Sequence, residues 1–234
     1  MPYLQKMVIT PNAIFTYKNN SARYGKKGKR GERIGPTSEQ QKKINKRIAR
    51  HKKLWTICKW FRNTDYLLTL TYRLADRPKT AKEAHAIAGK VMAKLSRILK
   101  AKGIKLSYKL MTERGERGAV HHHVLIKNTF NIGIFFEKRL WEYGAVHYDP
   151  EEMKRTKIIQ IAKYFVKGDS DDSEKLFSKS RDLVCPKPLV KIIPADDWRD
   201  KPIVKKNYEL WDFADGVEGE RGTMYQEYIM VKRE

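Results

Sequence analysis

Residues 119–127 read AVHHHVLIK, and residues 104–113 shortly before them read IKLSYKLMTE. Both runs are rich in apolar, β-branched and aromatic residues, which is typical of strands. The segment Arg114-Gly-Glu-Arg-Gly118 between them has the glycines of a short hairpin loop. The pattern therefore predicts two neighbouring antiparallel strands, over Ile104–Glu113 and Ala119–Lys127.

The segments on either side of this hairpin alternate between strand and helix patterns. Thr80-Ala-Lys-Glu83 is a capping box, in which each side chain satisfies a free backbone N–H at a helix start. The remaining elements are predicted as a strand over Tyr66–Tyr72, a helix from Thr80 to Gly103, a helix over Ile134–Tyr143, a strand over Ala145–Tyr148 and a helix over Glu151–Lys167. This order predicts an α+β fold, with a central antiparallel sheet of about five strands and helices packed on one face.

The two ends of the chain differ from this middle part in composition. Residues 1–37 are polar and rich in glycine, and they are interpreted as a flexible arm that orders on an anionic partner, or as a solubilising tail. A basic helix is expected to begin at Ser38. The stretch after the acidic loop that follows Gly168 contains Pro186, Pro188, Pro194 and Pro202 and is expected to be irregular, except for an extended segment near Met224–Val231. We therefore expect a basic arm and helix over 1–60, a domain over 61–190 and an extension over 191–234.

The charge of the chain points to a polyanionic partner. The 234 residues include 50 Lys and Arg against 27 Asp and Glu, a formal net charge of +23. Nucleic acid is favoured over an anionic membrane surface, because phosphate contacts dominate nucleic-acid binding. No membrane-spanning run or signal peptide is recognised, so a cytoplasmic protein is expected. The residues expected to contact DNA are Lys26, Lys27, Lys29, Arg30, Lys46, Arg50, Lys53 and Lys163.

The three consecutive histidines suggest a metal site. Side chains alternate along a strand, so His121 and His123 share one face while His122 points to the other. Glu113 ends the preceding strand and can approach the same face, whereas Glu116 in the loop is a weaker candidate. Two imidazoles and a carboxylate suit Mg²⁺, Mn²⁺ or a similar ion. The alternative is a surface histidine cluster, or adventitious metal binding.

A tyrosine and a lysine three residues apart on the last predicted helix form the second candidate feature. Tyr164 and Lys167 project from the same side of that helix. A tyrosine hydroxyl can attack a phosphodiester and form a covalent link, and a lysine can stabilise the developing charge. The alternative is that both are ordinary surface residues, because this spacing is common by chance.

Taken together and in this order, these features resemble the HUH endonuclease superfamily, specifically the rolling-circle replication initiators of phages and plasmids. Leu67-Leu-Thr-Leu-Thr71 resembles their first motif. Glu113 with Gly118-Ala-Val-His121-His-His123 resembles the second, and Tyr164-Phe-Val-Lys167 the third. The resemblance spans roughly residues 65–191. It departs at His122, where a bulky apolar residue is usual; a histidine facing the core needs a hydrogen-bond partner there.

The resemblance implies an RRM-like HUH nuclease fold and a metal-dependent DNA endonuclease and strand transferase. Glu113, His121 and His123 would hold the metal, Tyr164 would form a 5′-phosphotyrosyl link at a replication origin, and Lys167 would assist. Gln160 and Gly168 stand four positions away, so a single-tyrosine enzyme is expected. Implied partners are single-stranded origin DNA and the host replication helicase and polymerase. The alternatives are a single-strand transposase of the same superfamily and a non-catalytic single-strand nucleic-acid binding protein.

Overall fold

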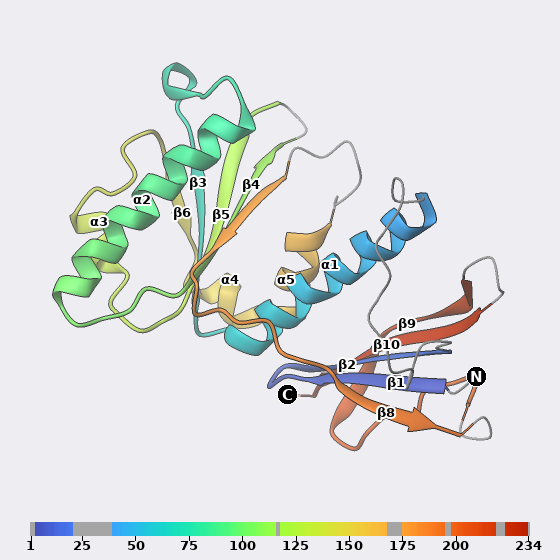
Figure 1. Ribbon diagram of the computed structural model, residues 1–234. Coiled ribbons are helices and arrows are strands. Elements are labelled where there is room, and N and C mark those ends of the chain that lie inside the picture. The colour runs from blue at the N-terminus through green and yellow to red at the C-terminus, as the bar shows by residue number, and fades with distance from the viewer. Residues whose placement is uncertain are drawn as a thin grey trace. The chain divides into compact units, whose positions relative to one another are not determined.

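The computed structural model describes residues 3–20, 39–115, 118–167, 175–194, 198–218 and 223–233. The chain divides into two compact units, one of them Trp60–Val184 and the other made of both ends, Met1–Lys59 and Cys185–Glu234. Within the described residues the strands form two five-stranded sheets, one in each unit, and every recorded strand pair is antiparallel (Figure 1). The two chain ends thus form one unit, rather than separate parts before and after a central domain, because their strands share a sheet.

The sheet of the Trp60–Val184 unit has the strand order β6-β3-β5-β4-β7. Its strands are β3 (Tyr66–Thr71), β4 (Tyr108–Arg114), β5 (Val120–Ile126), β6 (Val146–Tyr148) and β7 (Leu176–Lys179). The predicted hairpin is β4–β5, and Gly118 in its loop has a positive φ of 75°, a conformation that glycine adopts without strain. The predicted α+β fold with a central antiparallel sheet is confirmed.

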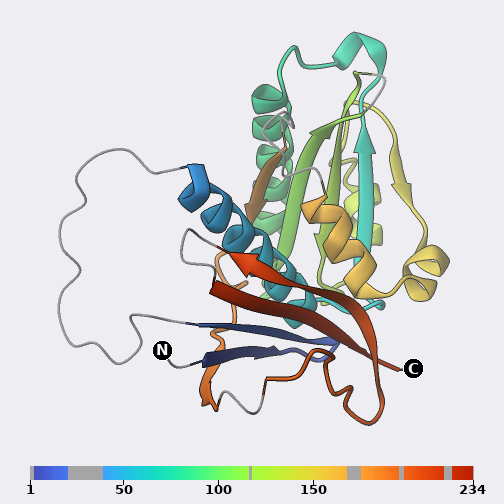
Figure 2. The same cartoon turned by 90° about the vertical axis from the view of Figure 1, so that its right-hand side faces the viewer.

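Helices cover both faces of this sheet, so the expectation of helices on one face is wrong (Figures 1 and 2). The long helix α2 (Ala81–Ala101) packs on the face of Leu68, Leu70 and Val124. The helix α5 (Ile158–Val166) lies on the opposite face, where its Tyr164 reaches Glu113. The physical reason is visible in β5, whose consecutive residues Val124 and Leu125 are both fully buried and therefore need cover on both sides.

Helix α2 begins as its sequence predicts. The Thr80 Oγ1 accepts a hydrogen bond from the Glu83 N–H at 3.1 Å, and the Glu83 carboxylate accepts one from the Lys79 N–H at 3.1 Å. Such a cap contributes about 1 kcal/mol. The predicted apolar stripe faces the core, with the fully buried residues Ala84, Ala88, Met92, Leu95 and Leu99.

Two other predicted helices are shorter than expected. The helix expected over Ile134–Tyr143 is α3, which spans only Gly133–Glu137. The helix expected over Glu151–Lys167 is two helices, α4 (Pro150–Arg155) and α5, because Lys157 between them is extended, with φ −63° and ψ 134°. A 3₁₀ turn, η1 (Leu74–Asp76), follows β3. None of the helices in the described part of the chain is long and apolar enough to cross a membrane.

The second unit contains a sheet that the sequence did not reveal. It has the strand order β8-β1-β2-β10-β9 and one helix, α1. Their bounds are β1 Tyr3–Ile9, β2 Ala13–Asn20, α1 Glu39–Trp60, β8 Leu189–Ile193, β9 Tyr208–Glu218 and β10 Thr223–Lys232. The expectation of a flexible arm is therefore wrong for residues 3–20, and that of an irregular end is wrong for β7, β8 and β9. Burial of Leu4, Val8, Ile14 and Phe15 explains why residues 3–20 are ordered.

One glycine in the Trp60–Val184 unit is required by a close backbone approach. A Cβ on Gly144 would lie 2.1 Å from the Thr71 carbonyl oxygen, whereas a Cβ on Gly89 in α2 would meet nothing within 4 Å. We expect Gly144→Ala to destabilise the protein by about 3 kcal/mol, because backbone must move to relieve the overlap. Gly89→Ala should stabilise it by up to about 1 kcal/mol through helix propensity. Urea denaturation of both variants measures this, and equal midpoints would contradict the close approach.

Candidate active site

Strand register brings the predicted metal ligands to one face of the sheet. In the β4–β5 hairpin Glu113 pairs directly with His121, and in the β3–β5 pair Thr69 pairs with His123. Residues directly opposite each other point to the same face. Glu113, His121 and His123 therefore converge beside α5, on the face opposite to α2.

The three side chains form a compact donor set. The Glu113 Oε1 lies 3.1 Å from the His121 Nε2 and 3.4 Å from the His123 Nε2. One ligand atom from each residue lies within 4.8 Å of the other two. Two imidazole nitrogens and one carboxylate oxygen suit a divalent ion, with coordination positions left for substrate. The residues present therefore fit a metal centre of the kind that the sequence predicts.

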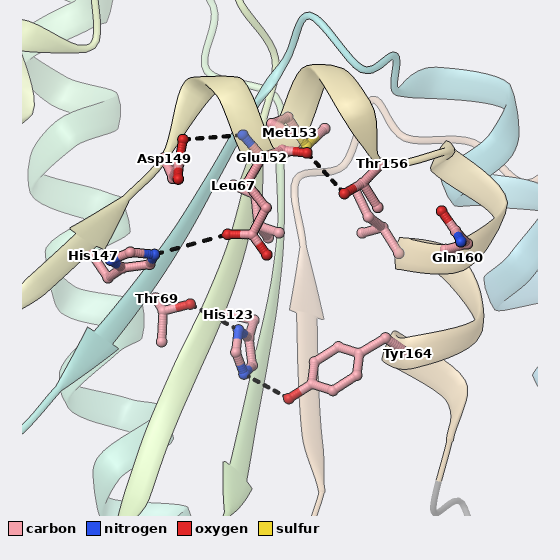
Figure 3. Close-up of a pocket in the computed structure, with 11 residues that line it drawn as sticks. Leu67, Thr69, His123, His147, Asp149, Glu152, Met153, Thr156, Gln160 and Tyr164 are labelled. Carbon is pink, nitrogen blue, oxygen red and sulfur yellow. Dashed lines mark hydrogen bonds and ion pairs between the residues drawn. The ribbon is translucent and has the colours of Figure 1, made fainter.

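The Tyr164 hydroxyl lies at this donor set. It donates a hydrogen bond to the Glu113 Oε1 at 2.5 Å. It also lies 2.9 Å from the His123 Nε2, a contact that Figure 3 shows. Its side chain remains 41% exposed, so a large substrate can approach the hydroxyl from solvent. The position on α5 places the tyrosine over β5, and the His123 and Tyr164 rings meet edge to face with centroids 5.0 Å apart.

The electrostatics of the site keep the glutamate charged and the tyrosine protonated. Burial acts to raise the pKa of Glu113, but hydrogen bonds from the surrounding histidines, lysine and tyrosine outweigh it and hold that pKa well below its usual range. Burial raises the pKa of Tyr164, and the hydrogen bond to Glu113 and the charge of that residue add to the effect. Activation of the hydroxyl therefore requires a positive charge nearby.

A lysine that the sequence did not single out supplies such a charge. The Lys175 Nζ lies 2.5 Å from the Glu113 Oε2 and 5.6 Å from the centroid of the Tyr164 ring, and its side chain is only 13% exposed. Lys167, the expected lysine, caps the end of α5 with an exposed side chain, and its carbonyl oxygen accepts a hydrogen bond from the Lys175 Nζ at 2.6 Å. No local spacing in the sequence relates Lys175 to Tyr164, because eight residues separate it from Val166, the last residue of the helix.

A neighbouring strand orients one of the candidate ligands. The Thr69 Oγ1 lies 3.1 Å from the His123 Nδ1, which leaves the Nε2 of that ring directed at Glu113 and Tyr164. A hydrogen bond at one imidazole nitrogen fixes the orientation of the ring and the role of the other nitrogen. Thr69 lies in the first sequence motif, so the strand pairing gives that motif a physical role in the site.

The central histidine has the hydrogen-bond partners that its burial requires. His122 is fully buried, and its Nε2 lies 2.9 Å from the Tyr72 hydroxyl while its Nδ1 lies 2.8 Å from the Thr112 Oγ1. The Thr112 Oγ1 lies in turn 2.7 Å from the His85 Nδ1 on α2. This polar chain links the residue that follows β3 to β5, β4 and α2 on the face opposite to the metal ligands.

The buried His122 predicts a loss of stability in acid. Burial, together with nearby histidine charges, lowers the pKa of His122 to about 3, so the folded state keeps it neutral while the unfolded chain binds a proton below about 6.5. The contribution of neutral His122 to the free energy of unfolding is complete above pH 6.5 and is lost as the pH falls below that value. Between pH 7.5 and 5 we expect a loss of about 2 kcal/mol from this group. Urea midpoints should fall less over this range in His122→Leu than in the wild type; an equal fall would contradict the assignment.

The residues expected to contact DNA do not all belong to one unit of the chain. Lys26, Lys27, Lys29 and Arg30 lie outside the described residues. Lys46, Arg50 and Lys53 belong to α1 in the unit formed by the chain ends, and Arg50 is exposed. Lys163 precedes Tyr164 on α5 and is half-buried. Lys163 is thus the one member of the set, among the described residues, that is adjacent in sequence to the candidate nucleophile.

The fold and the site define an α+β protein whose antiparallel sheet carries a candidate metal centre beside a tyrosine. Residues 65–169 match the family model described as Replication-associated protein ORF2/G2P. The match covers the three motifs and confirms, over these residues, the resemblance to rolling-circle replication initiators. No curated protein and no solved structure matches the chain significantly.

Proposed function

We propose that this protein nicks and joins single-stranded DNA at a replication origin through a covalent bond to Tyr164, and so initiates rolling-circle replication. The observation that carries the proposal is the position of the Tyr164 hydroxyl, within hydrogen-bonding distance of both Glu113 and His123. A surface tyrosine without a role in the chemistry has no reason to end at a donor set of this kind. The family match supports the link to replication.

The proposed reaction exchanges one phosphodiester for another. The Tyr164 oxygen attacks the phosphorus, the bond from phosphorus to the 3′ oxygen breaks, and a 5′-phosphotyrosyl bond forms. The phenol proton passes to solvent, and the positive charge of Lys175 beside the ring favours the phenolate that this leaves. The leaving 3′ oxygen takes up a proton from solvent, and attack by that hydroxyl in reverse rejoins the strand. The covalent intermediate conserves the energy of the broken bond.

Glu113, His121 and His123 are the residues that would hold a divalent ion, with Mg²⁺ and Mn²⁺ as the expected ions. When bound, such an ion polarises the scissile phosphate and stabilises charge on its oxygens. Thr69 keeps the Nε2 of His123 directed into the site, and Glu113 stays ionised at neutral pH, so both ligands are in the form that binds metal.

A gel assay tests the proposed function directly. The full chain is incubated with a pool of single-stranded oligonucleotides of random sequence, with Mn²⁺, and analysed under denaturing conditions. We expect a protein band of raised mass that carries DNA and that nuclease treatment shortens. Addition of EDTA before the DNA should prevent the band. Absence of the band over a range of Mn²⁺ and Mg²⁺ concentrations, with the pool in excess, would contradict the proposal.

Lys175 takes, in this proposal, the role that the sequence motif assigns to Lys167. Its ammonium group lies close to the Tyr164 ring and forms an ion pair with Glu113, and its positive charge there favours the phenolate that develops during attack. We expect Lys175→Ala to reduce the single-turnover rate of adduct formation roughly a hundredfold, as loss of one stabilising donor does, whereas Lys167→Ala stays near the wild-type rate. The reverse ranking of these two variants would contradict the role of Lys175.

The sequence leaves two further functions open. A single-strand transposase would use the same site and differ in its DNA target, and a non-catalytic single-strand binding protein would form no adduct. The proposal also includes single-stranded origin DNA as the substrate, contacted by the basic residues named above, and the host replication helicase and polymerase as partners in the cytoplasm. A hairpin origin next to the coding region would favour replication over transposition.

A further inference from the structure

A pocket lies directly beside the candidate nucleophile. It has a volume of about 410 Å³, within the range of about 300–1,000 Å³ that is typical of small-ligand sites. Its floor comes from β3 and β5 and its walls from the start of α4 and from α5, all within one unit (Figure 3). The lining residues are Leu67, Thr69, His123, His147, Asp149, Glu152, Met153, Thr156, Gln160, Ile161 and Tyr164.

The charge of this lining is opposite to that of the chain. Although the chain carries a formal charge of +23, the described residues around the pocket include the carboxylates of Asp149 and Glu152 and no Lys or Arg. A phosphate group is disfavoured beside two carboxylates. The apolar residues Leu67, Met153 and Ile161, together with the rings of His123 and Tyr164, instead offer the kind of surface on which a base rests.

The carboxylates are placed to accept hydrogen bonds from a base. The Oδ1 of Asp149 accepts the N–H groups of Glu151 and Glu152 at 2.9 and 3.0 Å, which fixes the side chain and leaves the Oδ2 to accept a ligand. The Glu152 Oε2 lies 3.9 Å from the His147 Nε2, and both of these side chains are largely exposed. Carboxylates accept from the amino groups of cytosine, adenine and guanine, whereas thymine has no amino group.

The pocket shares His123 and Tyr164 with the candidate active site. When the scissile phosphate of a DNA strand lies at Tyr164, a base next to that phosphate is therefore within reach of the pocket. We propose that the pocket binds one unpaired nucleobase next to the scissile phosphate and selects an amino-bearing base over thymine. This inference rests on the proposed function for the place of the phosphate. It adds a site of base recognition formed by Asp149 and Glu152.

Sequencing of covalently captured DNA tests the pocket. The random pool is incubated with the full chain and Mn²⁺, and the bases on both sides of the nick are read from the adducts and the released strands. In the wild type, thymine should be depleted roughly tenfold at one flanking position, in line with one good side-chain contact to a base edge. Asp149→Asn and Glu152→Gln should each reduce that depletion while adducts still form.

The chain offers a matched control. Asn replaces Asp well as a helix N-cap, so Asp149→Asn is expected to keep α4 folded. Glu151→Gln changes a carboxylate in the same turn that does not line the pocket and is paired with Lys154, and it should keep the wild-type base profile. Thymine at its frequency in the starting pool on both sides of the wild-type nick, or an unchanged profile in Asp149→Asn and Glu152→Gln, would overturn the inference.

A metal-free binding assay separates failure of the pocket from failure of the proposed function. In EDTA, the wild type should bind a dC 12-mer several-fold more tightly than a dT 12-mer, and Asp149→Asn should bind the two more nearly equally. If no adduct forms, but the wild type prefers the dC 12-mer and Asp149→Asn loses that preference, the proposed nicking function is wrong and the base pocket is supported. Equal affinity of the wild type for both oligonucleotides overturns the pocket, whether or not adducts form.

Discussion

Tyr164→Phe is expected to abolish the covalent protein–DNA adduct while leaving single-stranded DNA binding within about twofold of the wild type. The substitution removes only the oxygen that the reaction requires as nucleophile. The phenylalanine ring retains the edge-to-face contact with His123, which supports folding of the site. A denaturing gel measures the adduct, and fluorescence anisotropy of a labelled oligonucleotide in EDTA measures binding.

Tyr148→Phe is the matched control for this variant. Tyr148 lies on β6 in the same unit, and its ring contacts Tyr66 and Phe136, contacts that phenylalanine retains. It should form adducts at the wild-type rate. If Tyr164→Phe still forms adducts, a different residue is the nucleophile and the proposed mechanism is wrong.

Removal of the metal ligands is expected to have the second large effect. The double variant His121→Ala with His123→Ala should lose Mn²⁺ binding and reduce nicking by roughly a thousandfold, because electrophilic stabilisation by a metal contributes several kcal/mol. Glu113→Ala should have a comparable effect, since the Oε1 of that residue lies at the centre of the donor set. Isothermal titration with Mn²⁺ measures binding apart from activity.

His147→Ala is the control for these ligand variants. His147 lies on β6 with a largely exposed side chain and is outside the triad, so Mn²⁺ affinity should not change. Nicking by the wild type that persists after exhaustive treatment with EDTA would contradict a role for metal. Wild-type Mn²⁺ affinity in the double histidine variant would contradict the choice of ligands.

The sequence predicts much of the sheet that carries the candidate site, because the information for its central hairpin is local. The β4–β5 hairpin has a short loop, so alternation along its two strands is enough to place Glu113 opposite His121. The same alternation predicts that His122 faces the core and needs a partner. Its partner Thr112 lies on β4 and its partner Tyr72 directly follows β3, so only the assembled sheet identifies them.

The features that the sequence did not reveal depend on contacts between distant residues. The second sheet pairs β1 and β2 with β8 and β10, strands from the other end of the chain, so no local pattern distinguishes them from an arm and a tail. Lys175 reaches Tyr164 from beyond the end of α5, whereas Lys167 has the motif spacing but an exposed side chain. Helical spacing predicts which residues share a side only while the helix continues.

The most direct test of the central claim is to identify the residue that carries the DNA. The adduct is digested with nuclease and protease, and tandem mass spectrometry locates the peptide that retains a nucleotide. The account predicts a nucleotide linked through phosphate to Tyr164, in a peptide from α5. A nucleotide on any other residue, or a DNA end released without attachment to the protein, would contradict it.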